Sequence, residues 1–156
     1  MDLLRKSPRV LAVTAIDMTG LRGAVRTYAV TGRPGLRITV ANLGLACCAV
    51  EFGSAVTRGL LEPADPALEP EMTVLVVSGT LTHQLAPSLL AAWDAVVGPR
   101  AVLALGACAT SGGPYWDSYA VVEGIDSVVP VASYVPGCPP RPEALVAAIV
   151  SLADAS

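Results

Sequence analysis

Gly44-Leu45-Ala46-Cys47-Cys48-Ala49-Val50-Glu51 is the stretch around which this chain is organised. It places two adjacent cysteines directly after an apolar run, Leu36 to Ala41. The other two cysteines also lie among glycines or prolines, in Gly106-Ala107-Cys108-Ala109-Thr110-Ser111-Gly112-Gly113 and Val135-Pro136-Gly137-Cys138-Pro139-Pro140. Loops of this kind can aim thiolates at one point, and four convergent thiolates suit a tetrahedral zinc ion or an iron–sulfur cluster. We therefore expect Cys47, Cys48, Cys108 and Cys138 to be the ligands of one metal site.

The adjacency of Cys47 and Cys48 bears on which metal group they would bind. Structural zinc sites usually separate a ligand pair by two to four residues, so that one turn chelates one ion. Neighbouring residues of an extended strand point to opposite faces, so both thiols can serve one site only if the backbone bends there. An iron–sulfur cubane offers separate iron corners, and each thiolate can take its own iron. The spacing thus favours an iron–sulfur cluster over zinc.

Composition and charge indicate one domain with a covered surface. The 156 residues include 53% hydrophobic and only 15% charged residues, so part of the surface is expected to face a partner. Residues 1–37 carry a balance of +5 and the remainder carries −8. A basic arm of residues 1–35 on an acidic body suggests contact with anionic lipid headgroups or an acidic partner, and a solvated tail is the alternative. The sequence lacks basic–aromatic interleaving, which argues against nucleic acid.

The sequence shows neither a membrane span nor an export signal. Its apolar runs fall short of the ~20 residues of a transmembrane helix, and Val10 to Ile16 lacks a credible cleavage site. Four cysteines without export favour metal or cluster binding over disulfides.

Apolar runs alternate with helical patterns from residue 36 to residue 156. Strands are expected at 36–40, 73–77, 101–105 and 133–135, and helices at 49–61, 86–97 and 142–152. This alternation predicts an α/β fold, a flavodoxin-like open parallel sheet with helices on both faces. The cysteine segments follow strands, so they should meet at the carboxyl edge of the sheet, where such folds bind ligands.

The cysteine motifs resemble a known family, the PSST-type iron–sulfur subunit of NADH-quinone oxidoreductase, or respiratory complex I. The segments that carry the resemblance are Gly44 to Glu51, Gly79-Thr80-Leu81-Thr82 with Leu85-Ala86-Pro87, Gly106 to Tyr115, and Tyr134 to Leu145. Nickel–iron hydrogenase small subunits are related, but their first two ligands are separated by other residues. The resemblance covers residues 36–150, and its motifs are highly specific.

The resemblance implies a flavodoxin-like subunit that holds one [4Fe-4S] cluster through Cys47, Cys48, Cys108 and Cys138. Electrons would arrive from another iron–sulfur subunit and pass to quinone at the interface with a larger subunit. The complex would lie on the cytoplasmic side of the membrane, which this chain would contact only through the complex. The subunit would not be active alone, and it would contribute no catalytic side chain.

Three features qualify this picture. The segment Gly53 to Met72 is shorter than in the family and holds a proline-rich acidic loop, in place of an arginine- and aromatic-containing stretch near the quinone channel. His83-Gln84 stands where the family has a small polar residue and a lysine. Glu51, three residues after Cys48, could couple a proton to cluster reduction, or simply stabilise a helix start as a negative charge near its amino end.

Two other functions are compatible with the same motifs. The chain could serve a membrane-associated nickel–iron hydrogenase-like complex, which the adjacent cysteines disfavour. It could also be a non-catalytic, cluster-binding assembly module that has lost quinone chemistry through the short Gly53–Met72 segment.

Overall fold

A six-stranded sheet with helices on both faces forms the protein. The computed structural model describes residues 27–42 and 47–156. The strands are β1 (Thr27–Val30), β2 (Arg33–Asn42), β3 (Leu61–Pro63), β4 (Met72–Ser78), β5 (Arg100–Leu105) and β6 (Ser133–Val135). The helices are α2 (Cys47–Thr57), α3 (Ala86–Ala95), α4 (Ala107–Ser111) and α5 (Pro142–Asp154), with 3₁₀ turns at Gly113–Tyr115 and Ile125–Ser127.

The spatial order of the strands is β3-β1-β2-β4-β5-β6. β2, β4, β5 and β6 run parallel, whereas β1 pairs antiparallel with both β2 and β3. The expected α/β fold with an open parallel sheet is therefore confirmed for the central strands, and the antiparallel strands β1 and β3, which were not expected, extend one side of it. The sheet includes residues 27–35, which the sequence analysis assigned to the basic arm, and the rest of that arm lies outside the described residues.

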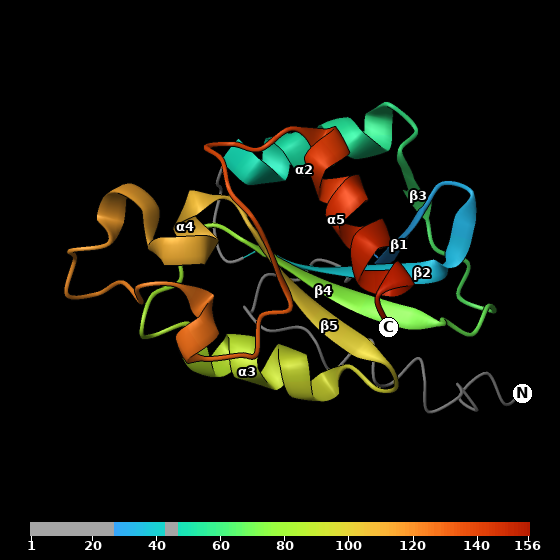
Figure 1. Cartoon of the computed structure of the whole chain (residues 1–156). Coiled ribbons are helices and arrows are strands. Elements are labelled where there is room, and N and C mark those ends of the chain that lie inside the picture. Colours follow the sequence, from blue (N-terminus) through green and yellow to red (C-terminus); the bar gives the residue numbers. More distant parts are fainter. Residues whose placement is uncertain (1–26, 43–46) are drawn as a thin grey trace, which may run out of the picture.

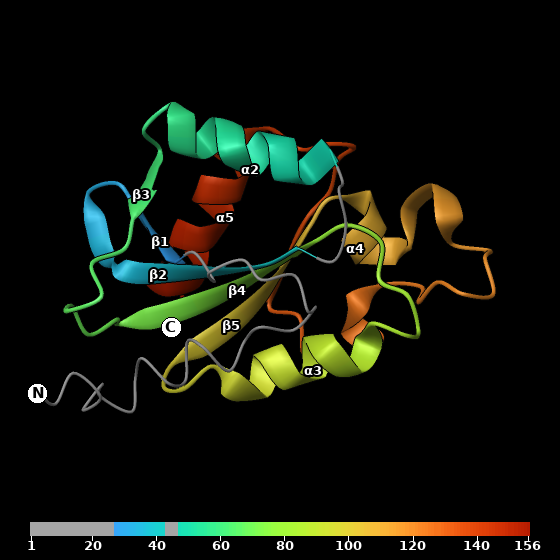
Figure 2. The ribbon, with the colours of Figure 1, turned by 180° about the vertical axis from the view of Figure 1, so that it is seen from behind.

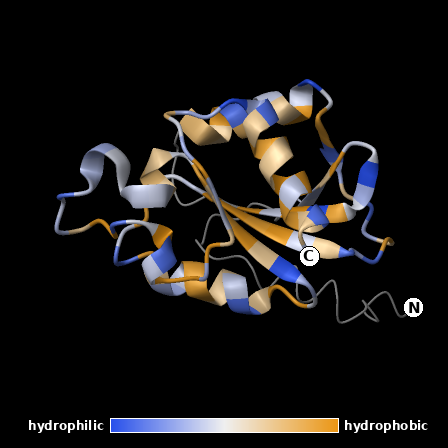
Figure 3. Cartoon of the chain, in the orientation of Figure 1, coloured by the Kyte–Doolittle hydropathy of each residue, from blue (hydrophilic) through white to orange (hydrophobic). Residues whose placement is uncertain are grey.

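Alternation along the central strands divides the interior into two layers. In β4, Val74 and Val76 belong to one buried cluster, while Leu75 and Val77 belong to the other. Side chains of a strand point alternately to opposite faces, so a continuous apolar run can supply two cores at once. Figure 3 shows this run as the strongly hydrophobic centre of the ribbon.

α2 and α5 cover one face of the sheet, and α3 covers the other (Figures 1 and 2). Phe52 of α2 and Leu145 of α5 are buried in the first cluster, and Leu89 of α3 in the second. The ring of Phe52 also meets Tyr28 of β1 edge to face, with ring centroids 5.2 Å apart. The helix that carries the tandem cysteines is thus packed against the antiparallel extension as well as the central sheet.

The observed elements differ most from the expected ones at α2 and in the segment that follows it. α2 begins at Cys47, so the tandem cysteines lie in its first turn and not in a preceding loop, and it ends at Thr57. The segment after it, expected as a proline-broken loop, contributes the short strand β3. Pairing with β1 supplies the backbone hydrogen bonds that the local sequence gives no sign of.

Within residues 27–42 and 47–156, no helix combines the length and the apolar character needed to cross a bilayer.

Candidate metal centre

The four cysteines lie on three segments near the carboxyl ends of the parallel strands. Cys47 and Cys48 open α2, Cys108 lies in the short helix α4 just after β5, and Cys138 follows β6 in an irregular segment. Adjacent residues of a strand would point to opposite faces, but Cys47 and Cys48 lie in the first turn of a helix and can both reach one site. Consecutive helical residues are separated by about 100° around the axis, not by the 180° of a strand.

The four thiols are close enough to influence one another's ionisation. Burial raises the pKa of the Cys48 thiol to about 11, and Cys47, Cys108 and Cys138 each add to this rise. Cys47 is also the main cause of the raised pKa of Cys138. Four groups that lose a proton to become anions oppose each other's ionisation when they are brought together. The structure therefore places the other three cysteines within electrostatic reach of Cys48.

Exposure divides the four cysteines into two kinds. Cys48 is 3% exposed and belongs to the core cluster beneath α2 and α5, whereas Cys47 and Cys138 are exposed and Cys108 is intermediate. All four are free of disulfides. One wall of the site is therefore buried protein, and the other side is open.

Two glycines receive the cysteine sulfurs. A Cβ atom at Gly106 would collide with Sγ of Cys48, and one at Gly113 would lie 3.0 Å from Sγ of Cys108. Both glycines have positive φ, at 87° and 57°. Gly112 and Gly137 instead face backbone, at Trp116 and Pro140. Two of the four thiols therefore each pack against a glycine, whose missing side chain leaves room for the sulfur atom.

Backbone hydrogen bonds join the last two cysteine segments. The amide of Gly106 donates to the carbonyl of Val135 over 2.8 Å, and the amide of Ala107 donates to Gly137 over 2.9 Å. The Thr110 hydroxyl donates to the carbonyl of Gly106 over 2.7 Å. Thr110 is not among the residues expected from the motifs, and its place two residues after Cys108 in a short glycine-flanked segment is the signal in the sequence that points to it.

Four cysteine thiols are the donor set of a [4Fe-4S] cluster. Among the described residues, no three His, Cys, Asp or Glu side chains are grouped as one metal ion requires. A [4Fe-4S] cluster is bound by four Cys thiolates, each on a separate iron, so its ligands are spread more widely than those of an isolated ion. Four cysteine thiols on three segments, two of them against glycine α-carbons, fit such a group.

Glu51 and the aromatic residues near the cysteines in the sequence lie in different settings. Glu51 is half-buried on α2, one turn beyond the tandem cysteines. Tyr115, Trp116 and Tyr119 follow α4 and are 57%, 58% and 97% exposed. The Tyr134 hydroxyl donates to Oδ2 of Asp126 over 3.2 Å, and partial burial together with that carboxylate raises the pKa of Tyr134.

The comparisons with known proteins identify the family. Residues 40–152 match the family model described as NADH ubiquinone oxidoreductase, 20 Kd subunit. The chain belongs to this family. The match confirms the resemblance that the cysteine motifs carry, and it spans all four cysteines.

Relatives of this chain include NADH-quinone oxidoreductase subunits of bacteria. One from Salinispora tropica is 44% identical over 122 residues, which cover 74% of this chain and 64% of the relative. "NADH-quinone oxidoreductase subunit 6" of Thermus thermophilus is 43% identical over 125 residues, covering 72% of this chain and 64% of the relative. The chain thus spans somewhat less than two thirds of the length of these two relatives.

A solved structure shares the fold. It is a chain of the membrane-bound sulfane sulfur reductase, described as an archaeal respiratory membrane complex. The TM-score is 0.59 at 28% identity, and the match covers 75% of this chain and 67% of that one. Members of this fold are therefore found in respiratory complexes other than NADH-quinone oxidoreductase.

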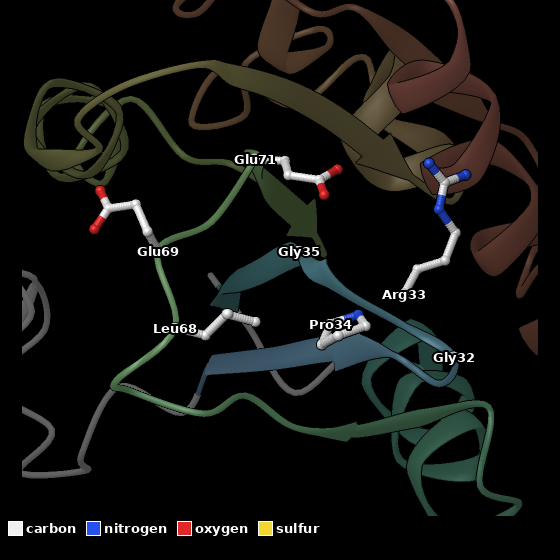
Figure 4. Close-up of a pocket in the computed structure, with 7 residues that line it drawn as sticks. All are labelled: Gly32, Arg33, Pro34, Gly35, Leu68, Glu69 and Glu71. Atoms are coloured by element: carbon white, nitrogen blue, oxygen red, sulfur yellow. The ribbon is translucent and has the colours of Figure 1, made fainter.

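The structure also contains a pocket far from the cysteines. It has a volume of about 330 Å³ and is formed where the β1–β2 turn meets the segment before β4 (Figure 4). Its lining includes Pro34, Leu68 and Glu71, and the Glu71 side chain lies so close to Gly35 that a Cβ there would be 2.7 Å from Cδ. The pocket lies at the amino-terminal ends of β2 and β4, opposite the end that carries the cysteines.

Proposed function

We propose that this chain is an electron-transfer subunit of a multi-subunit, NADH-quinone oxidoreductase-like complex. In this role Cys47, Cys48, Cys108 and Cys138 hold one [4Fe-4S] cluster. The observation that carries the proposal is that cysteines from three segments approach the buried Cys48 thiol, in a chain of the 20 kDa subunit family. The cluster would supply one-electron transfer between a donor and an acceptor.

The protein's own part is to hold and shield the group. Burial of Cys48 against the core closes one side of the site to water, and solvent exposure is one of the properties that set a cluster's potential. The exposed Cys47 and Cys138 face the open side. This asymmetry suits a relay, because the open side can be covered by a partner that exchanges electrons.

Exposed apolar residues close to the cysteines in the sequence support a partner there. Val50, three residues after Cys47, is 71% exposed, and Tyr115, Trp116 and Tyr119 follow Cys108. Aromatic side chains are enriched in protein interfaces and often dominate their binding energy. The proposed occupant is a larger subunit that completes a quinone site, with a second iron–sulfur subunit as the electron donor. The complex would be peripheral to the membrane on its cytoplasmic side.

Anaerobic reconstitution of the full chain tests the proposed cofactor. We expect about four irons and four sulfides per chain, with a broad absorbance near ~400 nm and an electron paramagnetic resonance signal after reduction. Stoichiometric zinc with iron excluded would contradict the proposal.

The partner and the acceptor need a second experiment, with the larger subunit co-expressed. Trp116→Ala should weaken co-purification of that subunit, whereas Leu90→Ala, an exposed change on α3, should leave it unchanged. Quinone reduction by the purified complex then separates an electron-transfer subunit from a non-catalytic module. A complex that contains the cluster and is reduced by its donor but does not reduce quinone would favour the module.

A further inference from the structure

Gly106 lies where the three cysteine segments meet. It is the single residue between β5 and α4, with φ 87° and ψ 169°, a region that is accessible essentially to glycine alone. Its α-carbon faces Sγ of Cys48, which occupies the place that a Cβ would take. Cys48 is reached from a distant part of the sequence, since 58 residues separate it from Gly106.

The peptide group between Gly106 and Ala107 is fixed on both of its sides. Its carbonyl accepts from the Thr110 amide over 3.1 Å and from the Thr110 hydroxyl over 2.7 Å. Its amide donates to Gly137, one residue before Cys138. One peptide group therefore connects the helix that holds Cys108 to the segment that holds Cys138, while the α-carbon of Gly106 lies against Cys48.

We infer that Gly106 is the positioning residue of the metal centre: it sets where the Cys48 thiol lies relative to Cys108 and Cys138. Any side chain at this position must displace Sγ of Cys48, because that atom already fills the space. The displacement can occur by rotation of the Cys48 side chain or by movement of the amino end of α2. In both cases the Cys48 thiol moves away from its position relative to Cys108 and Cys138. The consequence for a cluster rests on the proposed function, whereas the contact itself does not.

Gly98 provides a matched control for the backbone. It has φ +86°, close to the +87° of Gly106, but a Cβ at Gly98 would meet nothing within 4 Å. Alanine at either position takes a positive φ, which disfavours a side chain, and the ψ of 169° at Gly106 adds a further backbone cost there. Only the Gly106→Ala change also meets a thiol, so the comparison is decided by the exposure of Cys48 in folded protein and not by the loss of stability.

The first experiment needs no cluster. In the full chain with Cys47, Cys108 and Cys138 replaced by serine, Cys48 is the sole cysteine, and its labelling by a neutral maleimide reports its exposure. Labelling should be slow in this parent, because the thiol is 3% exposed. Gly106→Ala should increase the rate about tenfold, and Gly98→Ala should leave it unchanged. Equal rates in the two variants, with circular dichroism showing folded protein, would overturn the inference.

A second pair of variants covers the case in which Gly106→Ala does not fold. Thr110→Val removes the hydroxyl bond to the Gly106 carbonyl with little change of shape, and Thr110→Ser keeps it. Thr110→Val should label faster than the parent, and Thr110→Ser should return the rate to the parent's value. Equal rates for valine and serine would count against the role of the Gly106 peptide.

The third measurement uses the reconstituted chain with all four cysteines. Gly106→Ala should retain about half or less of the iron that Gly98→Ala retains, with an altered electron paramagnetic resonance spectrum, because ligand sites tolerate only small displacements. Iron content and spectrum equal to those of Gly98→Ala would contradict the inference. A parent chain that takes up no iron would refute the proposed function alone, since the labelling experiment still decides the role of Gly106.

Discussion

The Arg58 guanidinium donates a hydrogen bond to Oε1 of Glu143. Arg58 follows the last residue of α2, and Glu143 lies in the first turn of α5. This pair therefore joins the carboxyl end of α2 to the amino end of α5, the two helices that cover the same face of the sheet. The helix that starts with Cys47 is thereby linked to the helix that begins four residues after Cys138.

This ion pair predicts a pH-dependent contribution to stability. The hydrogen bond from Arg58 is the main cause that lowers the pKa of Glu143 in the folded chain. A carboxylate with a depressed folded pKa contributes stability above its unfolded pKa and loses it as pH falls through the folded pKa. Both side chains are about half exposed, so the effect should be small. Glu143→Gln should lower the melting temperature slightly at pH ~7, and the difference should disappear at strongly acidic pH.

Glu62→Gln, an exposed change on β3, is the control for the loss of a negative charge. A Glu143→Gln difference that grows as the pH is lowered would mean that the bond to Arg58 does not favour the ionised carboxylate.

Cys108→Ser should remove most of the iron from the reconstituted chain. Serine keeps the approximate shape of cysteine but is a far poorer ligand for iron, which prefers thiolate. Ser111→Ala, in the same short helix, is the matched control, because its hydroxyl bonds only to the carbonyl of Ala107. Iron and sulfide analysis of both variants measures the difference. A full complement of iron in Cys108→Ser would show that this cysteine is not a ligand.

Glu51→Gln should flatten the pH dependence of the cluster's reduction potential. Added negative charge on a reduced cluster favours protonation of a nearby carboxylate, so the potential of the parent should fall as pH rises, by at most ~59 mV per pH unit. Glutamine keeps the size of the side chain and removes the titrating group. Redox titrations of both proteins over about pH 6 to 9 measure the slopes. If the slopes are equal, the coupled proton belongs to another group, and Glu51, which lies beyond the first turn of α2, serves a partner contact.

Leu145→Ala should destabilise the chain by about 2–5 kcal/mol, because it leaves a cavity between α5 and the sheet. Leu145 is 1% exposed and belongs to the cluster that also contains Cys48 and Phe52. Val97→Ala is the control, since Val97 is 80% exposed and its truncation should change stability by less than ~0.5 kcal/mol. Urea unfolding of the two variants gives the comparison. A loss below ~1 kcal/mol for Leu145→Ala would mean that α5 is not firmly packed on the sheet.

The central strands could be predicted because their signal is local. Thr73-Val74-Leu75-Val76-Val77 is an uninterrupted apolar run, and β4 extends it by one residue at each end. β1 and β3 could not be predicted in the same way, since they are four and three residues long, and β3 ends in a proline. Their strand conformation depends on pairing with one another and with β2, which is a tertiary effect.

Some features of the candidate site could likewise be predicted from the local sequence, and others depend on tertiary packing. The identity of the four cysteines and their approach at one end of the sheet follow from motifs and from the rule for parallel sheets. The start of α2 at Cys47, the contact of Gly106 with Cys48 and the bond from Thr110 depend on how distant segments meet. The sequence shows Gly106 as a glycine of a short loop. Only the packed structure shows that Sγ of Cys48 fills the space of a side chain at this position.

The two outer strands of the sheet limit how this protein can assemble. β3 and β6 are each three residues long, β3 ends at Pro63, and Pro136 follows β6 directly. Short edges with proline offer few free amide and carbonyl groups for another strand to join. Growth of the sheet from chain to chain is thereby discouraged. Specific association must then come from side chains that fit a partner's surface, which allows selection to change partners one residue at a time while the sheet stays intact.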